Sequence, residues 1–193
     1  FGNKNLTSGE GGIITTNDKS AATRLRNIRS LAFGIVGNKF VHEEIGYNYR
    51  LTNVHAAIAF SQTQNAENLI SKRISVCEKY DELLNNFKEL VLPVKRDHVK
   101  NTYWMYHVRI KEPDIICRES LTSFLSKVGV ETRNGFVPYS QQNNINKKSN
   151  FNNPNANLCA KTTFYIPTFL DITTEQQQYV VESLILAFKS IKK

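Results

Sequence analysis

The chain opens with Phe1-Gly2-Asn3-Lys4-Asn5-Leu6-Thr7-Ser8-Gly9-Glu10-Gly11-Gly12 and continues into the apolar stretch Ile13-Ile14-Thr15-Thr16. A lysine follows a Gly-Asn pair, and the glycines of residues 9–12 predict a turn because glycine adopts positive φ without steric cost. Residues 12–16 predict a short strand. The opening therefore indicates a lysine on a short loop beside a tight turn and a strand. Because the chain starts without Met, we expect it to be cut from a longer protein.

The composition is that of an ordinary globular protein. Of the 193 residues, 40% are hydrophobic and 22% are charged, and the length suits one domain or slightly more. No apolar run approaches the ~20 residues that span a bilayer, so we predict no membrane segment. The cysteines Cys77, Cys117 and Cys159 lack zinc-like spacing, and we expect reduced thiols in a cytoplasmic protein.

The net charge of +8 and the pI of about 9.4 raise the question of nucleic-acid binding. The basic residues are scattered, however, and tight groups such as Lys72-Arg73 and Lys147-Lys148 are not interleaved with aromatic residues that could stack on bases. We therefore interpret the charge as a solvated surface with some anion-binding sites, and we predict no nucleic-acid partner.

The first part of the chain predicts two helices separated by a long loop. A helix is expected over residues 20–30, with a cap at Asn17 or Asp18. Residues 33–50 carry three glycines and no sustained period, which is typical of a long functional loop. One helix is then expected over residues 54–85, which start small and apolar and end charged. That gradient suits a helix that leaves one core and crosses to a second unit.

The rest of the chain alternates between short predicted elements. They are a strand at 103–110, a helix at 120–127 stopped by Gly129, a strand at 130–132, an exposed loop at 140–157, a strand at 164–167, and a helix from a capping box at Thr173 and Gln176 to about Lys189. One stripe of the last helix should face a sheet: Tyr179, Val180, Ser183, Leu184 and Ala187. This order predicts a small α/β unit with a sheet covered on one side. The first part lacks enough strands to close a core of its own.

Lys4 invites a chemical interpretation because of its neighbours. A lysine amine becomes a nucleophile when burial or nearby positive charge lowers its pKa. It can then form an imine with an aldehyde such as that of pyridoxal 5'-phosphate (PLP). From the lysine alone, an ordinary solvated side chain is the favoured interpretation.

Several segments resemble the DegT/DnrJ/EryC1/StrS family of PLP-dependent sugar aminotransferases, which have aminotransferase fold type I. Residues 2–18, GNKNLTSGEGGIITTND, resemble the lysine segment of the family, residues 46–58 its GYNYR motif and the helix after it, and residues 103–106 the first strand of its small domain. Within the family, the chain looks most similar to the subgroup of GDP-perosamine synthase-like 4-aminotransferases. The resemblance implies an α/β fold in which residues 1–73 end the large PLP domain, with the lysine loop and the start of the interdomain helix. Residues 74–193 would form the small C-terminal α/β domain.

The resemblance also implies the chemistry. Lys4 would bind PLP covalently and carry the proton between substrate and cofactor, and because dehydratase relatives have His at this position, Lys4 favours transamination. The amino group would pass from an amino acid donor, glutamate, to a keto sugar linked to a nucleotide diphosphate. Asn48 falls where the family reaches across a homodimer interface to the cofactor phosphate of the neighbouring subunit. Arg50 would bind the phosphates of the sugar nucleotide, since a guanidinium matches phosphate geometry.

The chain departs from the family pattern at two places. Where the family often reads Arg-Pro-x-x-x-Pro-Leu-His, this chain reads Arg133-Asn134-Gly135-Phe136-Val137-Pro138-Tyr139-Ser140, without the usual His. The chain also starts just after the phosphate-binding Ser of the family, so the Asp that pairs with the pyridine nitrogen and the aromatic that stacks on the ring would lie upstream. Because the ring is a poor electron sink without that Asp, we predict that these 193 residues alone are not a competent enzyme. A non-catalytic remnant or interaction module of the same fold stays an alternative.

Overall fold

The computed structural model describes residues 2–33, 40–42, 44–143 and 153–191. The chain forms two compact units, which we name unit 1 (Phe1–Glu67) and unit 2 (Asn68–Lys193). The boundary between them lies near the start of helix α3 (Ala66–Leu84), and the boundary that the sequence suggests, after Arg73, lies in the same helix. The assignment of 1–73 and 74–193 to two family domains stays a prediction.

Unit 2 is built on an antiparallel sheet with the strand order β1-β2-β4-β3. Its strands are β1 (Leu90–Val91), β2 (Tyr106–Ile110), β3 (Arg133–Asn134) and β4 (Thr163–Ile166). At the centre of the sheet, Val108 of β2 pairs with Phe164 of β4. Alternate residues of β2, namely Tyr106, Val108 and Ile110, are buried, which gives the sheet one face toward the core.

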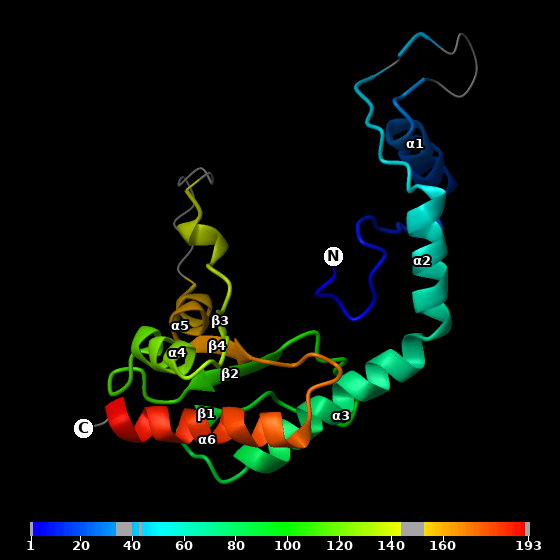
Figure 1. Ribbon diagram of the computed structural model, residues 1–193. Helices are drawn as coiled ribbons and strands as arrows, with labels where there is room; N and C mark the ends of the chain where they lie inside the picture. Colours follow the sequence, from blue (N-terminus) through cyan, green and yellow to red (C-terminus); the bar gives the residue numbers. More distant parts are fainter. Residues whose placement is uncertain (1, 34–39, 43, 144–152, 192–193) are drawn as a thin grey trace. The chain divides into compact units, whose positions relative to one another are not determined.

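Among the described residues of unit 2, four helices accompany this sheet. Besides α3 they are α4 (Arg118–Lys127), α5 (Pro154–Thr162) and α6 (Thr174–Ile191), and a 3₁₀ turn occupies Tyr139–Gln141. Figure 1 shows α6, in red, running along the sheet. It packs against α4, and the amide of Gln177 donates a 2.8 Å hydrogen bond to the carbonyl of Val76 in α3. The predicted capping box forms, because Thr173 and Gln176 each donate a backbone N–H to the side chain of the other.

The hydrophobic core of the described residues belongs to unit 2. Its largest fully buried side chains include Tyr80, Tyr106, Phe164, Leu184 and Phe188. The predicted small α/β unit with a covered sheet is thus confirmed. The predicted stripe of α6 is confirmed except at Tyr179, which is 51% exposed and whose hydroxyl donates a 2.7 Å hydrogen bond to the Val128 carbonyl.

Unit 1 contains helices α1 (Lys19–Arg29) and α2 (Asn53–Gln64). The carboxylate of Asp18 accepts hydrogen bonds from the N–H groups of Ser20 and Ala21, which confirms the predicted cap of α1. Among the described residues of this unit, Ala32 is the only buried hydrophobic side chain. The expectation that the first part of the chain closes no core of its own is therefore confirmed for these residues.

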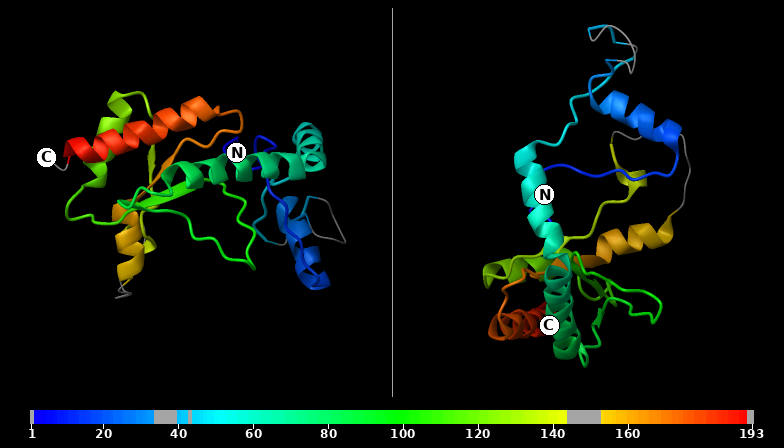
Figure 2. Two further views of the ribbon diagram at one scale, coloured as in Figure 1. Left: turned by 90° about the horizontal axis from the view of Figure 1, so that it is seen from below. Right: turned by 90° about the vertical axis from the view of Figure 1, so that its right-hand side faces the viewer.

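The strand predicted over residues 12–16 is wrong. These residues have no regular secondary structure, and Ile13 and Ile14 are exposed. The segment before α1 runs as a drawn-out coil, visible in blue in Figure 2. A strand exists only where a neighbour completes its hydrogen bonds, and no strand within the described ranges pairs with this one.

The single helix predicted over residues 54–85 is also wrong, since it is interrupted at Asn65 between α2 and α3. The N–H of Asn65 bonds the Gln62 carbonyl at 3.2 Å, three residues back, which ends the α-helical pattern. The Thr63 hydroxyl donates to the Ala59 carbonyl at 2.7 Å, and such contacts bend helices.

Two element boundaries in unit 2 differ from the prediction. The strand expected at 130–132 is found at β3 instead, because the Val130 N–H bonds the Leu125 carbonyl and closes α4, with Gly129 at φ +79°. The strand expected from residue 103 begins only at Tyr106, and Tyr103 has a positive φ of 46°.

The predicted loops were partly wrong as well. Residues 154–157, expected in an exposed loop, begin α5, where Pro154 occupies the first turn that suits its fixed φ. Residues 144–152 of that loop, and residues 34–39 and 43 of the loop expected at 33–50, lie outside the described residues. Within the described ranges, no helix has the length and apolar character needed to cross a bilayer.

Candidate functional site

The GYNYR segment at residues 46–50 is docked on the end of α1. The N–H of Tyr47 bonds the Ile28 carbonyl at 2.7 Å, and the N–H of Tyr49 bonds the Arg29 carbonyl at 3.0 Å. These carbonyls lie in the last turn of α1, where they have no partner inside the helix. The docking therefore gives the carbonyls at the end of α1 their hydrogen-bond partners. It also holds Asn48, which forms an isolated bridge with Ser30, in a defined place.

Gly46 is required by this docking. A Cβ atom at this position would lie 2.3 Å from the backbone carbon of Leu31 and 2.4 Å from the backbone nitrogen of Ala32. Both are main-chain atoms that cannot rotate away, so only glycine allows the segment to approach so closely. Gly46, the first residue of the motif, thus helps to position the two candidate binding residues that follow it, Asn48 and Arg50.

Asn48 and Arg50 are brought together by the structure. The Nε of Arg50 donates a 3.0 Å hydrogen bond to Oδ1 of Asn48, and both side chains are exposed. Because Oδ1 faces Arg50, the amide nitrogen of Asn48 points elsewhere and can donate to another group. A guanidinium and an amide side by side form a donor pair that suits a phosphate.

The lysine segment runs beside α2. The N–H of Thr7 bonds the side-chain carbonyl of Gln62 at 3.3 Å, and the α-carbon of Gly9 faces the ring of His55. Figure 1 shows this dark blue segment next to α2. Lys4 itself is exposed on the turn before Thr7.

Lys4 and Asn48 belong to opposite ends of α2. The lysine segment contacts Gln62 in the last turn, whereas Asn48 precedes the cap at Thr52. A helix of 12 residues is about 18 Å long at 1.5 Å per residue. The contacts of one chain therefore do not gather these two residues around one small ligand.

A hollow of about 1050 Å³ lies between residues 10–16, α1 and residues 49–51. Its apolar lining includes Ile13, Ile14, Leu25 and Leu51. Arg26, Arg29, Arg50 and His55 supply polar groups to it. Of the predicted site residues, Arg50 alone is among the lining residues of this hollow.

The sequence predictions missed three of those polar residues. Arg26 and Arg29 are three residues apart on α1, a spacing that places two side chains on one helix face, so the pair could have been found from the helical period. His55 follows the cap Thr52 and donates its backbone N–H to the Thr52 hydroxyl at 3.3 Å. Its ring faces Gly9 through a tertiary contact for which the sequence offers no signal.

The residues of unit 1 are chemically compatible with PLP. Lys4 provides an exposed amine for the aldehyde, and the Asn48–Arg50 pair provides donors for a phosphate. The lysine and the phosphate-donor pair lie toward opposite ends of α2. Lys4, Asn48 and Arg50 thus fit the chemistry of PLP, although they do not surround one PLP molecule.

Two polar clusters of unit 2 lie on its sheet. The Tyr106 hydroxyl donates to Asp81, and Lys95 Nζ lies 2.8 Å from the other carboxylate oxygen. Burial, followed by this hydrogen bond, raises the pKa of Tyr106. On the opposite sheet face, His107 packs on Tyr165 with ring centroids 4.6 Å apart, and burial lowers the pKa of His107. No group of metal-ligating side chains occurs in the described part of the chain.

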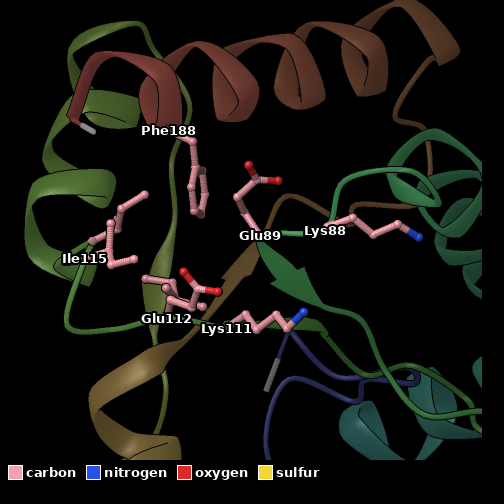
Figure 3. Close-up of a pocket in the computed structure, with 8 residues that line it drawn as sticks. Lys88, Glu89, Lys111, Glu112, Ile115 and Phe188 are labelled. Carbon is pink, nitrogen blue, oxygen red and sulfur yellow. The ribbon is translucent and has the colours of Figure 1, made fainter. Parts of the chain in front are cut away.

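A second hollow, in unit 2, measures about 150 Å³ and is shown in Figure 3. Phe188 and Ile115 line it, and the labelled Lys88 and Lys111 extend away from it. Ligand sites usually measure roughly 300–1000 Å³, so this hollow is small for a substrate. None of the predicted site residues lines it.

The comparison with known proteins agrees with the sequence segments. Residues 1–185 match the model of the DegT/DnrJ/EryC1/StrS aminotransferase family. GDP-perosamine synthase of Escherichia coli O157:H7 is 32% identical over 184 residues, which are 95% of this chain and 49% of that protein. The chain therefore spans about half the length of this relative.

Solved structures show the same fold. The aminotransferase TlmJ from Streptoalloteichus hindustanus superimposes with a TM-score of 0.85 at 21% identity, over 97% of this chain and 50% of that one. The putative sugar aminotransferase Spr1654 from Streptococcus pneumoniae, in its PLP form, superimposes with a TM-score of 0.78 at 14% identity, over 97% and 50%. The predicted fold class, part of aminotransferase fold type I, is thereby confirmed. With the family model matching almost the whole chain, this protein belongs to the DegT/DnrJ/EryC1/StrS aminotransferase family.

Proposed function

We propose that this chain is part of a PLP-dependent aminotransferase that transfers an amino group from an amino acid, glutamate, to a keto sugar linked to a nucleotide diphosphate. The observation that carries the proposal is Lys4, exposed on its turn inside the segment that the family model matches. The name of the E. coli relative points to a GDP-linked sugar as the substrate. Products of this kind enter amino-sugar and cell-surface polysaccharide synthesis, and the reaction would take place in the cytoplasm.

When bound, PLP supplies an aldehyde and an electron-withdrawing ring that accept and release an amino group. The amine of Lys4 would hold the cofactor and would carry a proton between the reacting carbon atoms, as general acid–base chemistry requires. Its exposure leaves room for both roles. Asn48 would donate to the cofactor phosphate, and Arg50 would bind the phosphates of the sugar nucleotide.

The position of Asn48 supports a homodimer. Because Lys4 and Asn48 lie toward opposite ends of α2, Asn48 of one subunit would serve the cofactor held by the Lys4 of another. This arrangement makes each active site depend on two chains.

The experiment uses a chimera in which this chain replaces the matched half of the E. coli relative. Chimera and PLP are mixed in equal amounts and reduced with borohydride, and the modified lysine is mapped by peptide mass spectrometry. We expect the label on Lys4, and we expect amino transfer from glutamate to a GDP-linked keto sugar. The 193-residue chain treated in the same way should show no transfer.

Two variants make the test specific. Lys4→Ala should abolish the label and the transfer, whereas Lys19→Ala, which removes another exposed lysine of unit 1, should change neither. Equal labelling of Lys19 and Lys4 would contradict the proposal. A chimera that takes the label at Lys4 without transferring an amino group would favour the non-catalytic alternative.

A further inference from the structure

The hollow of about 150 Å³ in unit 2 has an apolar floor (Figure 3). Ile110 of β2 and Phe188 of α6 line it and are 1% and 2% exposed. The ring of Phe87 meets that of Phe188 almost perpendicularly, with centroids 5.0 Å apart, so neighbouring side chains hold the Phe188 ring in place. The floor is therefore a fixed apolar surface that includes an aromatic ring.

Charged side chains surround this floor, and they do not all face it. Glu89 and Glu112 line the hollow, and Figure 3 shows their carboxylates on the side of the Phe188 ring. Lys88 and Lys111 extend their amines away from it in the same view. The charge that faces the hollow is accordingly negative.

Backbone hydrogen bonds fix the places of both glutamates. The N–H of Lys111 donates to the Glu89 carbonyl at 2.9 Å, which continues the pairing of β1 with β2. The N–H groups of Ile115 and Ile116 donate to the Glu112 carbonyl at 3.2 and 3.3 Å, and this turn brings both isoleucines to the lining of the hollow. The mouth of the hollow is thus built by the main chain rather than by side chains alone.

Size and charge restrict what the hollow can hold. Cavities of roughly 150 Å³ accept one molecule of about the size of benzene, so a sugar nucleotide is far too large. An anion would meet two carboxylates, whereas an ammonium group can donate to both of them. An aromatic ring beside the carboxylates adds to the attraction of a cation. A compact cation with a short apolar chain is the class of ligand that matches every part of the lining.

We propose that this hollow binds a small primary alkylammonium ion, with its chain on Ile110 and Phe188 and its ammonium group beside Glu89 and Glu112. The charge complementarity of the mouth and the apolar floor behind it carry the proposal. None of the residues that we assign to the aminotransferase site lies in unit 2, so this binding stands or fails independently of the proposed function.

A titration followed by amide NMR spectra tests the binding. The 193-residue chain is suitable because unit 2 has a continuous core of its own. With n-butylammonium chloride at constant ionic strength, we expect saturable shifts of the amide signals of Glu89, Ile115 and Ile116. Butanoate, which carries a similar chain with the opposite charge, should bind at least roughly tenfold more weakly, since it loses the charged hydrogen bonds to the glutamates. Shifts that do not saturate, or equal affinities for the two ions, would overturn the proposal.

A first pair of variants tests the charge. Glu112→Gln should weaken n-butylammonium binding by roughly tenfold, because it removes one charged acceptor. Glu182→Gln removes the same charge from an exposed position of α6 that does not line the hollow, and it should leave the affinity unchanged. Both glutamates are exposed, so both variants should keep the amide spectrum of the folded core. Equal losses of affinity would mean that the cation responds only to the net charge, and the site would be refuted.

A second pair tests the apolar wall. Ile115→Ala should weaken the binding several-fold, since the alkyl chain loses apolar surface that it would cover. Val94→Ala, at a position of unit 2 that is 70% exposed and outside the lining, should have no effect. An affinity that is insensitive to Ile115→Ala would contradict the placement of the chain in the hollow.

One further outcome identifies a different occupant. If the amide signals of Glu89 and Ile115 shift as the concentration of the protein rises, with no amine added, a lysine of a second copy fills the hollow. The proposal of a small ligand would then be wrong. Signals that stay constant upon dilution and move only with n-butylammonium would support it.

Discussion

Unit 1 and unit 2 differ in what holds their helices. In unit 2, α3, α4 and α6 contribute side chains to a continuous buried cluster against a sheet. In unit 1, α1 and α2 are capped by Asp18 and Thr52, yet α2 buries none of its residues. Local signals thus suffice to begin and end a helix, whereas a sheet and a core require partners that are distant in the sequence. The stability of the chain should accordingly reside in unit 2.

The largest difference in stability between the two units should appear when a core side chain is removed. Leu184 is fully buried, and Leu184→Ala should lower the free energy of unfolding by about 2–5 kcal/mol through lost burial and the cavity left behind. Ile14→Ala in unit 1 should change it by less than about 0.5 kcal/mol, because Ile14 is already exposed. Denaturant unfolding followed by circular dichroism measures both. Similar losses for the two variants would show that unit 1 has a core of its own.

The elements that the sequence predicted well depend on local chemistry. The cap at Asp18, the capping box at Thr173 and Gln176, and the stop at Gly129 each act within a few residues, and each is present. The break at Asn65 escaped prediction because the residues around it remain acceptable helix formers. It follows from the bond of the Thr63 hydroxyl to the helix backbone, which competes with the regular pattern.

The candidate site was predictable only in its residue types. The motif around Asn48 and Arg50 indicated anion binding, and the structure joins the two side chains. The place of Lys4 could not be derived, because it depends on a contact between Thr7 and Gln62, which are far apart in the sequence. The strand predicted over residues 12–16 does not form, because strand formation depends on a partner that the sequence pattern does not contain.

High pH should destabilise unit 2 selectively. Burial raises the pKa of Tyr80 and Tyr106, and it raises the pKa of Cys77 to about 12. The unfolded chain ionises these groups at ordinary values, near 9 for cysteine and 10 for tyrosine, while the folded chain does not. Stability is therefore complete below about pH 9 and falls above it, by up to about 1.4 kcal/mol per pH unit for each group.

The tyrosine contribution can be isolated by substitution. Tyr80→Phe should make the alkaline loss of stability shallower, although it also removes the hydrogen bond to the Pro167 carbonyl and so lowers stability at neutral pH. Tyr49→Phe in unit 1, where the side chain is 72% exposed, should leave the pH profile unchanged. Unfolding curves between pH 7 and about 11 supply the comparison. A slope unaffected by Tyr80→Phe would show that this buried hydroxyl does not control alkaline unfolding.

The smallest difference in stability between the two units should appear when a helix cap is removed from each. Thr173→Ala removes the acceptor for the Gln176 N–H at the start of α6, and it should cost about 1 kcal/mol of unfolding free energy because α6 belongs to the core. Asp18→Ala removes an equivalent cap from α1, with two N–H groups losing their acceptor. That loss should lower the helical content of residues 19–29 without moving the unfolding midpoint, since α1 has no buried residue to couple it to unit 2. An unfolding midpoint that falls as much with Asp18→Ala as with Thr173→Ala would show that α1 belongs to the same cooperative unit as α6.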